Sequence, residues 1–175
     1  MVMRPQVCST VAVSRHVPPE GFMQEKLMGH SQRNISVSET GLGKYQNEIV
    51  IGQHRLLASE PESLGGDDSG PTPIELLEAA LGACTTITLR MYADRKKWPL
   101  EQVSVDVKYK RGQLEECGNG ETGSSNKPMD IFTKKIHLTG PLDAEQRERL
   151  LYIAEKCPVH KILGKKACLR SELGE

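Results

Sequence analysis

The feature that most constrains the fold is a long helical pattern that begins at Thr72. It opens with TPIELLEAALGACTTITLRMY and continues to Arg95 with a single internal glycine. Thr72 is a good N-cap, Pro73 suits the first helical position, and Glu75 completes a T-x-x-E capping box. The sequence therefore predicts one helix about 35 Å long, comparable to the diameter of a small domain.

This predicted helix has a wide apolar face. Its stripe comprises Ile74, Leu77, Leu81, Cys84, Thr85, Thr88, Met91 and Tyr92, and it is widened by Ala79, Ala80 and Ala83. Small residues such as these alanines and Gly82 allow other backbones to approach closely. We therefore predict a central, largely buried helix that carries Cys84 inside its stripe.

The remaining segments show strand and helix patterns in turn. Strands are predicted at residues 33–39, within 45–59, at 98–111, at 131–138 and at 167–173, and helices at 141–157 and 158–163. In the segment 98–111, Val103, Val105 and Val107 share one face and charged residues occupy the other, as in a half-exposed antiparallel strand. This order predicts an α+β fold. We expect one domain at residues 30–175, preceded by a tail at residues 1–29.

Charge and composition exclude several classes of function. Lys plus Arg and Asp plus Glu number 23 each, so the chain lacks the basic footprint of a nucleic-acid-binding protein. No apolar run approaches the roughly 18 residues that a membrane span needs. Residues 1–19 contain Arg4 and Arg15 but no acidic residue, a bias of mitochondrial transit peptides, although three prolines interrupt any helix there. We expect a cytoplasmic protein, with a mitochondrial transit peptide left open.

The cysteines indicate a reducing compartment and candidate thiol chemistry. There are five, Cys8, Cys84, Cys117, Cys157 and Cys168, and no C-x-x-C pair. An odd count without that spacing argues against a disulfide scaffold. Cys157 precedes Pro158 and so caps the next helix, where backbone N–H groups favour a thiolate. The alternative for Cys157 is a small apolar filler, and for Cys84 a core residue.

Cys157 and Cys84 could also act together. If their helices converge, the two thiols could form a disulfide, one being oxidised to a sulfenic acid and the other resolving it. His160 forms a C-x-x-H spacing with Cys157, but a zinc site needs two further ligands at suitable positions, so we expect no metal. An acyl-transfer site built from Cys157 and His160 is a third alternative.

Two regions resemble the signatures of a known family. The segments GPTPIELLEAALGACTTITLRMYADRKKWPLEQV and EKCPVHKIL are similar to those around the two cysteines of the OsmC/Ohr family, the osmotically inducible and organic hydroperoxide resistance proteins. HRLLASEPESLGGDDSG resembles the segment before the first cysteine in one branch, and the likeness extends over about residues 30–172.

The resemblance implies an OsmC-like fold of antiparallel sheets on a long central helix, in an intertwined homodimer with active sites at the subunit interface. It implies a peroxidase that reduces organic hydroperoxides, and hydrogen peroxide less efficiently, without metal or other cofactor. Cys84 would be the peroxidatic thiol and Cys157 the resolving one. An external dithiol, such as a lipoylated protein, would restore the pair.

The chain departs from the family pattern at two activating residues. The family glutamate corresponds to position 74, which is Ile74 here, and Glu75 lies one residue later, about 100° further around the helix. Glu75 is therefore a candidate for catalysis or only for capping. No arginine reproduces the family motif; Arg55 is the nearer candidate, with a strand-surface charge as the alternative. These departures support a second hypothesis, a non-enzymatic dimeric module that binds a ligand or partner.

Overall fold

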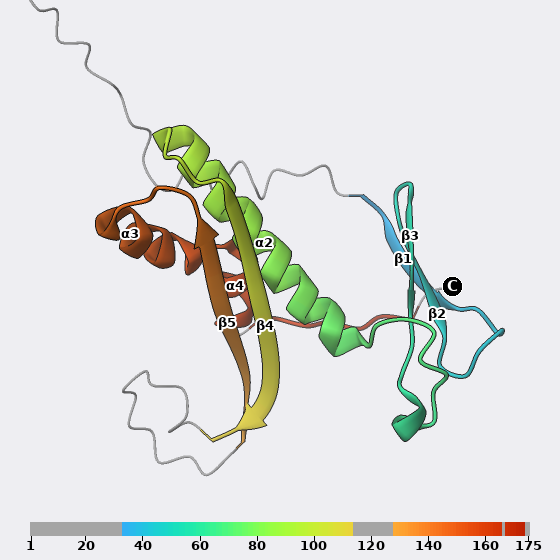
Figure 1. Cartoon of the computed structure of the whole chain (residues 1–175). Helices are drawn as coiled ribbons and strands as arrows, with labels where there is room; N and C mark the ends of the chain where they lie inside the picture. The colour runs from blue at the N-terminus through green and yellow to red at the C-terminus, as the bar shows by residue number, and fades with distance from the viewer. Residues whose placement is uncertain (1–32, 114–127, 166, 174–175) are drawn as a thin grey trace, which may run out of the picture. The chain divides into compact units, whose positions relative to one another are not determined.

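The computed structural model describes residues 33–113, 128–165 and 167–173, all within one compact unit, Ser31–Glu175 (Figure 1). The predicted boundary at residue 30 falls outside the described residues, as do Cys8 and Cys117. The elements follow in the order β1 (Ile35–Glu39), β2 (Asn47–Ile51), β3 (His54–Ala58), η1 (Glu62–Leu64), α2 (Pro73–Lys96), β4 (Gln102–Gly112), β5 (Met129–Thr139), α3 (Ala144–Ala154) and α4 (Pro158–Leu163). The predicted α+β content with antiparallel sheets is confirmed.

Strands β1, β2 and β3 form an antiparallel sheet in the order of the chain. Its register places Val37, Ile49 and Leu56 directly across from one another. Ile35 and Ile51 pair beside them, so one face of the sheet is apolar. Ser36, Ser38, Glu48 and Arg55 lie on the opposite face. Ile35, Val37 and Leu56 are 65%, 59% and 49% exposed, so this apolar face is uncovered in the described part of the chain.

Helix α2 begins and ends where the sequence predicts. The Thr72 hydroxyl accepts from the Glu75 N–H, and the Glu75 carboxylate accepts from the Thr72 N–H, which completes the capping box. The C-terminal half of the stripe is buried, including Leu81, Thr85, Thr88 and Tyr92. Its N-terminal end is not, because Ile74 and Leu77 are 40% and 42% exposed. Ala79, Ala80 and Ala83, predicted to widen the stripe, are also exposed, so burial within the described chain is limited to part of the predicted face.

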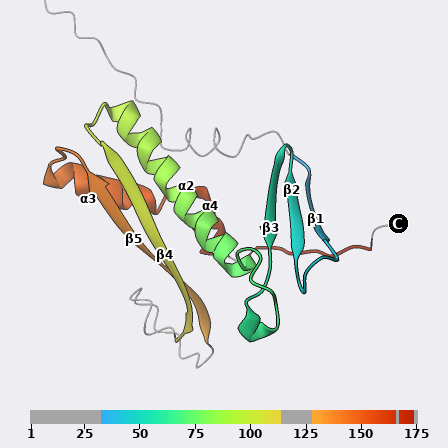
Figure 2. The same cartoon turned by 45° about the vertical axis from the view of Figure 1, so that its right-hand side comes forward.

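Strands β4 and β5 form a two-stranded antiparallel ribbon that packs on α2 (Figures 1 and 2). Along β4 the exposure alternates as predicted, with Val103, Val105 and Val107 on the less exposed face. A Cβ added at Gly82 of α2 would lie only 3.3 Å from a methyl of Val107. The missing side chain thus allows the close approach of helix and strand, as expected for small residues at this point.

Helices α3 and α4 also contact α2. Asp143 caps α3 in a box with Gln146, and Leu150, Ile153 and Ala154 form its buried face. The core thus collects around the C-terminal half of α2, where Leu89 and Ala93 are fully buried together with Leu150. No helix in the described part of the chain combines the length and apolar character that crossing a membrane requires.

One predicted element is wrong. Residues 167–173, expected as a last short strand, have no regular secondary structure. A strand exists only through pairing, and this segment pairs with none of the described strands. The apolar pattern of the segment is not sufficient on its own, and Leu169 and Leu173 are fully exposed.

Candidate functional site: the paired thiols of Cys84 and Cys157

The structure brings Cys84 and Cys157 together. Cys84 lies in the middle of α2 and is partly buried, whereas Cys157 is completely buried at the N-cap of α4. Both are free thiols, and the Cys84 side chain hydrogen-bonds that of Cys157. Helices α2 and α4 therefore do converge at the two cysteines, which the sequence alone could not establish.

The surroundings of Cys84 favour the neutral thiol. Burial first, then the hydrogen bond to Cys157, raise the pKa of Cys84 from an ordinary value of 9.0 to about 11. Two contacts oppose this rise in pKa: the backbone N–H of Val159 and the hydroxyl of Thr88. In the structure as it stands, Cys84 is protonated at neutral pH.

The backbone N–H groups at the N-terminus of α4 were predicted to stabilise the Cys157 thiolate, but the structure shows a different arrangement. The Cys157 side chain makes no capping hydrogen bond to its own helix. The Val159 N–H in the first turn of α4 instead hydrogen-bonds Cys84. The joint at Pro158 thus supplies a donor to the cysteine of the other helix, although the net effect of its surroundings still raises the pKa of Cys84.

Lys134 of β5 is a third member of the site, and it was missed by the sequence prediction. Its ammonium donates to the carbonyl oxygen of Ala154 at 2.8 Å, close before Cys157. Burial lowers the pKa of Lys134, while the charges of Cys157, Glu155 and Cys84 raise it. A signal was present in the sequence: Phe132, Lys134 and Ile136 alternate on one face of the predicted strand, so a lysine occupies an inward position.

His160 lies on α4 near these groups. Burial lowers its pKa, with smaller contributions from Lys134 and Lys156, so the neutral imidazole is favoured. Among the described residues, no group of three or more His, Cys, Asp or Glu side chains could hold a metal ion. The complete burial of Cys157 also places its sulfur out of reach of an acyl substrate, against the acyl-transfer alternative.

The two candidate activating residues lie elsewhere. Glu75 is held in the capping box, whose hydrogen bonds from Thr72 lower the pKa of its carboxyl. Nine residues separate it from Cys84, which places the two on opposite faces of α2. Arg55 pairs with Glu48 at 2.9 Å on the surface of the three-stranded sheet. A catalytic role for Glu75 stays a prediction.

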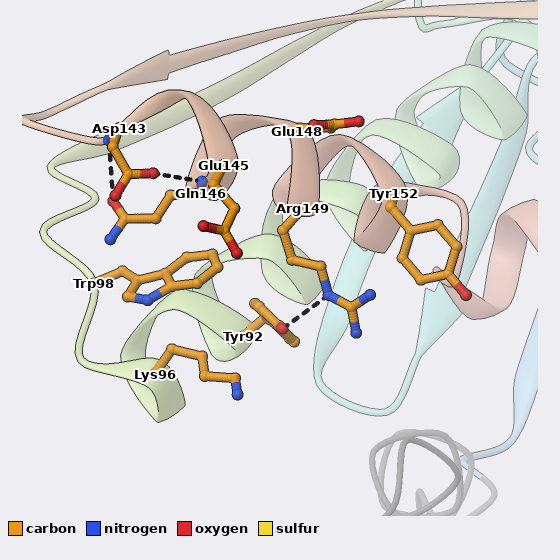
Figure 3. Close-up of a pocket in the computed structure, with 9 residues that line it drawn as sticks. All are labelled: Tyr92, Lys96, Trp98, Asp143, Glu145, Gln146, Glu148, Arg149 and Tyr152. Carbon is orange, nitrogen blue, oxygen red and sulfur yellow. Dashed lines mark hydrogen bonds between the residues drawn. The ribbon is translucent and has the colours of Figure 1, made fainter.

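A separate pocket of about 760 Å³ lies between the C-terminal end of α2 and α3. Figure 3 shows Trp98, Tyr92 and Tyr152 on its walls, with Arg149 between the two tyrosines. The Arg149 Nε donates to the buried Tyr92 hydroxyl at 3.1 Å. Neither Cys84 nor Cys157 lines this pocket. Tyr92 is about 12 Å further along α2 than Cys84, so the pocket is distinct from the thiol site.

The family assignment agrees with this arrangement. Residues 66–170 match the model of the family described as OsmC-like protein. Because the match covers more than half of the 175 residues, the chain belongs to the OsmC-like family. Both paired cysteines fall inside the matched region, as the resemblance of their segments predicted.

Solved structures share the fold at low sequence identity. The organic hydroperoxide resistance protein OsmC from Legionella pneumophila is 22% identical with a TM-score of 0.54, covering 76% of this chain and 90% of that one. An OsmC-like protein from Mycoplasma pneumoniae is 15% identical with a TM-score of 0.57, covering 77% and 88%. An organic hydroperoxide resistance protein from Elizabethkingia anophelis is 20% identical with a TM-score of 0.54, and the match covers 75% of this chain and 89% of that one. No curated protein matches this chain closely in sequence.

Proposed function

We propose that this chain is a thiol peroxidase that reduces organic hydroperoxides, and hydrogen peroxide less efficiently, through Cys84 and Cys157. The observation that carries the proposal is that two free cysteines from different helices meet, one partly and one fully buried, so that the Cys157 side chain acts directly on the Cys84 thiol. Such a pair can pass from dithiol to disulfide once the sulfurs close to about 2.05 Å. Family membership supports the same chemistry, because some structural neighbours are named organic hydroperoxide resistance proteins.

In the proposed reaction the Cys84 thiolate attacks the distal oxygen of the hydroperoxide. An S–O bond forms as the O–O bond breaks, and the leaving alkoxide takes up a proton to become an alcohol. Cys84 is then a sulfenic acid. The Cys157 sulfur attacks it, the S–S bond forms, and hydroxide leaves as water with the remaining proton. An external dithiol, which we expect to be a lipoylated protein or a small dithiol, reduces the disulfide.

We also propose that the active unit is a homodimer of domains spanning residues 30–175, each with a tail at residues 1–29. The uncovered apolar face of the three-stranded sheet supports the dimer, because a small sheet needs a packed second layer to be stable. The free cysteines Cys84, Cys157 and Cys168 support a reducing compartment, which we propose is the cytoplasm.

A second function is supported by a specific observation. The raised pKa of Cys84 keeps its thiol protonated at neutral pH, and thiols react with peroxides as thiolates. A module that binds a ligand or partner and uses neither cysteine would have the same feature. The peroxidase therefore requires a group that stabilises the thiolate during reaction, whereas the binding module does not.

The experiment that separates the two functions is stopped-flow thiol oxidation with cumene hydroperoxide. It compares the unsubstituted protein with Cys84→Ser, Cys157→Ser and the control Cys168→Ser, which removes an exposed cysteine. A peroxidase reacts far faster than a free thiol, loses the reaction in Cys84→Ser, accumulates a sulfenic acid in Cys157→Ser, and is unaffected in Cys168→Ser. Oxidation at the rate of a free thiol, with Cys168 modified first, contradicts the peroxidase and supports the binding module.

A further inference from the structure

The inward position of Lys134 is unusual for a lysine. In the β4–β5 register Lys134 lies opposite Val107, on the face of the ribbon that carries Phe132 and Ile136. Lysine is rarely buried without a partner, since removing an ammonium from water is costly. Lys135, the next residue, points to the opposite face and is exposed. The strand therefore places one of two adjacent lysines toward the helices.

The contacts of Lys134 position its charge close to the thiols. Its Nζ donates to the carbonyl oxygen of Ala154, a residue at the end of α3 that is only 1% exposed. This hydrogen bond satisfies one of three ammonium donors and places the charge near the turn leading to Cys157. Electrostatic attraction to both Cys157 and Cys84 follows from the position of the ammonium.

We propose that Lys134 is a positioning residue for the thiol pair, whose ammonium stabilises the thiolate of Cys84 during its reaction with an electrophile. The proposal rests on the proposed function insofar as the electrophile is a hydroperoxide. The stabilisation itself applies to any reagent that attacks the Cys84 sulfur. Lys134 would thus supply from β5 a positive charge for the thiols, whereas Arg55 is paired with Glu48 on the surface of the three-stranded sheet.

Other charges near the site do not supply this stabilisation as directly. His160 on α4 favours its neutral form, and Glu155 after α3 is negative and so opposes a thiolate. Lys156 acts on His160 and lies over the ring of Tyr152, with its Nζ 4.2 Å from the ring centroid. Cys157 itself raises the pKa of Cys84. Lys134 is the cation that acts on both thiols among these groups.

The test measures alkylation of Cys84 by iodoacetamide as a function of pH, with the modified peptide quantified by mass spectrometry. The variants are Lys134→Met, Lys134→Arg and the matched control Lys135→Met. An opposite charge beside a thiol lowers its pKa by roughly one to three units, so if the Lys134 ammonium stabilises the Cys84 thiolate, Lys134→Met should slow alkylation at pH 7.5 by about tenfold or more and move the rate profile to higher pH. Lys134→Arg should restore most of the rate, and Lys135→Met should leave it unchanged.

Two outcomes overturn the proposal: an unchanged alkylation profile in Lys134→Met, or an equal change in Lys135→Met. If Lys134→Met does not fold, as judged by circular dichroism, the charge-retaining Lys134→Arg decides: a Cys84 alkylation rate tenfold or more below that of the unsubstituted protein, in a folded Lys134→Arg variant, overturns the proposal. Alkylation needs no peroxide, so the result stands whether or not cumene hydroperoxide is reduced. Failure of the peroxidase is detected separately by the stopped-flow assay.

Discussion

The hydroxyl of Thr88 donates to the carbonyl oxygen of Cys84 at 2.7 Å, one turn earlier on the same helix. The same hydroxyl has the smallest of the effects on the Cys84 pKa and lowers it; its single proton can be donated either to the carbonyl or to a Cys84 thiolate. Thr88 is only 2% exposed, so water cannot replace it. Thr88 thus both stabilises the helix backbone and forms part of the environment of the Cys84 thiol.

Thr88→Val should raise the pKa of Cys84 further, because the hydroxyl that favours the thiolate is removed. Because the Thr88 hydroxyl has the smallest of the effects on the Cys84 pKa, we expect alkylation of Cys84 at neutral pH to slow by about twofold to threefold. The matched control is Thr85→Val, because Thr85 is also buried and donates to the Leu81 carbonyl at 2.8 Å. Equal effects in the two variants would contradict the role of Thr88.

The stability of the fold should fall at alkaline pH through Cys84. The pKa of this thiol rises from 9.0 in an ordinary environment to about 11 in the fold, so the unfolded chain loses its proton first. The contribution is fully present below pH 9 and is lost as the pH rises toward 11. We expect the melting temperature of Cys84→Ser to decrease less over this range than that of the unsubstituted protein. Parallel curves for the two proteins would show that Cys84 is not responsible.

Gly140→Ala should be strongly destabilising. Gly140 has a φ of +127°, and an added Cβ would lie 2.2 Å from the Pro99 carbonyl oxygen. Backbone strain and this overlap together should reduce the free energy of unfolding by about 3 kcal/mol or more in urea titrations at fixed protein concentration. Gly41→Ala is the control, because Gly41 also has a positive φ but nothing within 4 Å, and about 1 kcal/mol is expected. A similar loss in both would mean that the contact with Pro99 is unimportant.

Val37→Asp should disrupt the proposed dimer. Val37 is 59% exposed in the centre of the apolar face of the three-stranded sheet, and a carboxylate there would have to be desolvated at an interface between copies. Sedimentation equilibrium should show a dimer for the unsubstituted protein and a monomer or unfolded chain for Val37→Asp. Ser36→Asp, on the opposite face of the same strand, should stay dimeric. A monomeric unsubstituted protein would refute the dimer itself.

The sequence predicted best those elements whose signals are local. The caps at Thr72 and Asp143, the proline starts of α2 and α4, and the alternation along β4 each depend on residues a few positions apart, and all are present. The strand expected at residues 167–173 depends on a partner strand, and local pattern does not report whether one exists. The exposure of Ile74 likewise depends on which other elements pack against the N-terminal end of α2, and the local sequence does not determine this.

Only those site residues that have a local sequence signal were predicted. Cys84 and Cys157 stood out because each lies in a recognisable local context, and the family resemblance paired them before their contact was visible. Lys134 lies far from both in the sequence, within a strand rich in charges, and only its register across from Val107 shows that it turns inward. The direction of the Val159 N–H toward Cys84 depends on how α4 meets α2, which no local pattern determines.

Gly82 affects the distance between the paired thiols and Lys134. It lies two residues before Cys84 on α2, and a Cβ added there would lie 3.3 Å from a methyl of Val107, the cross-strand neighbour of Lys134. The separation between helix and ribbon at this point therefore also sets how far the lysine must reach to the sulfur. A methyl group at position 82 would push helix α2 and the ribbon apart without contacting Cys84 or Lys134. The absence of a side chain at Gly82 therefore keeps the Cys84 sulfur and the Lys134 ammonium closer together than an alanine would allow.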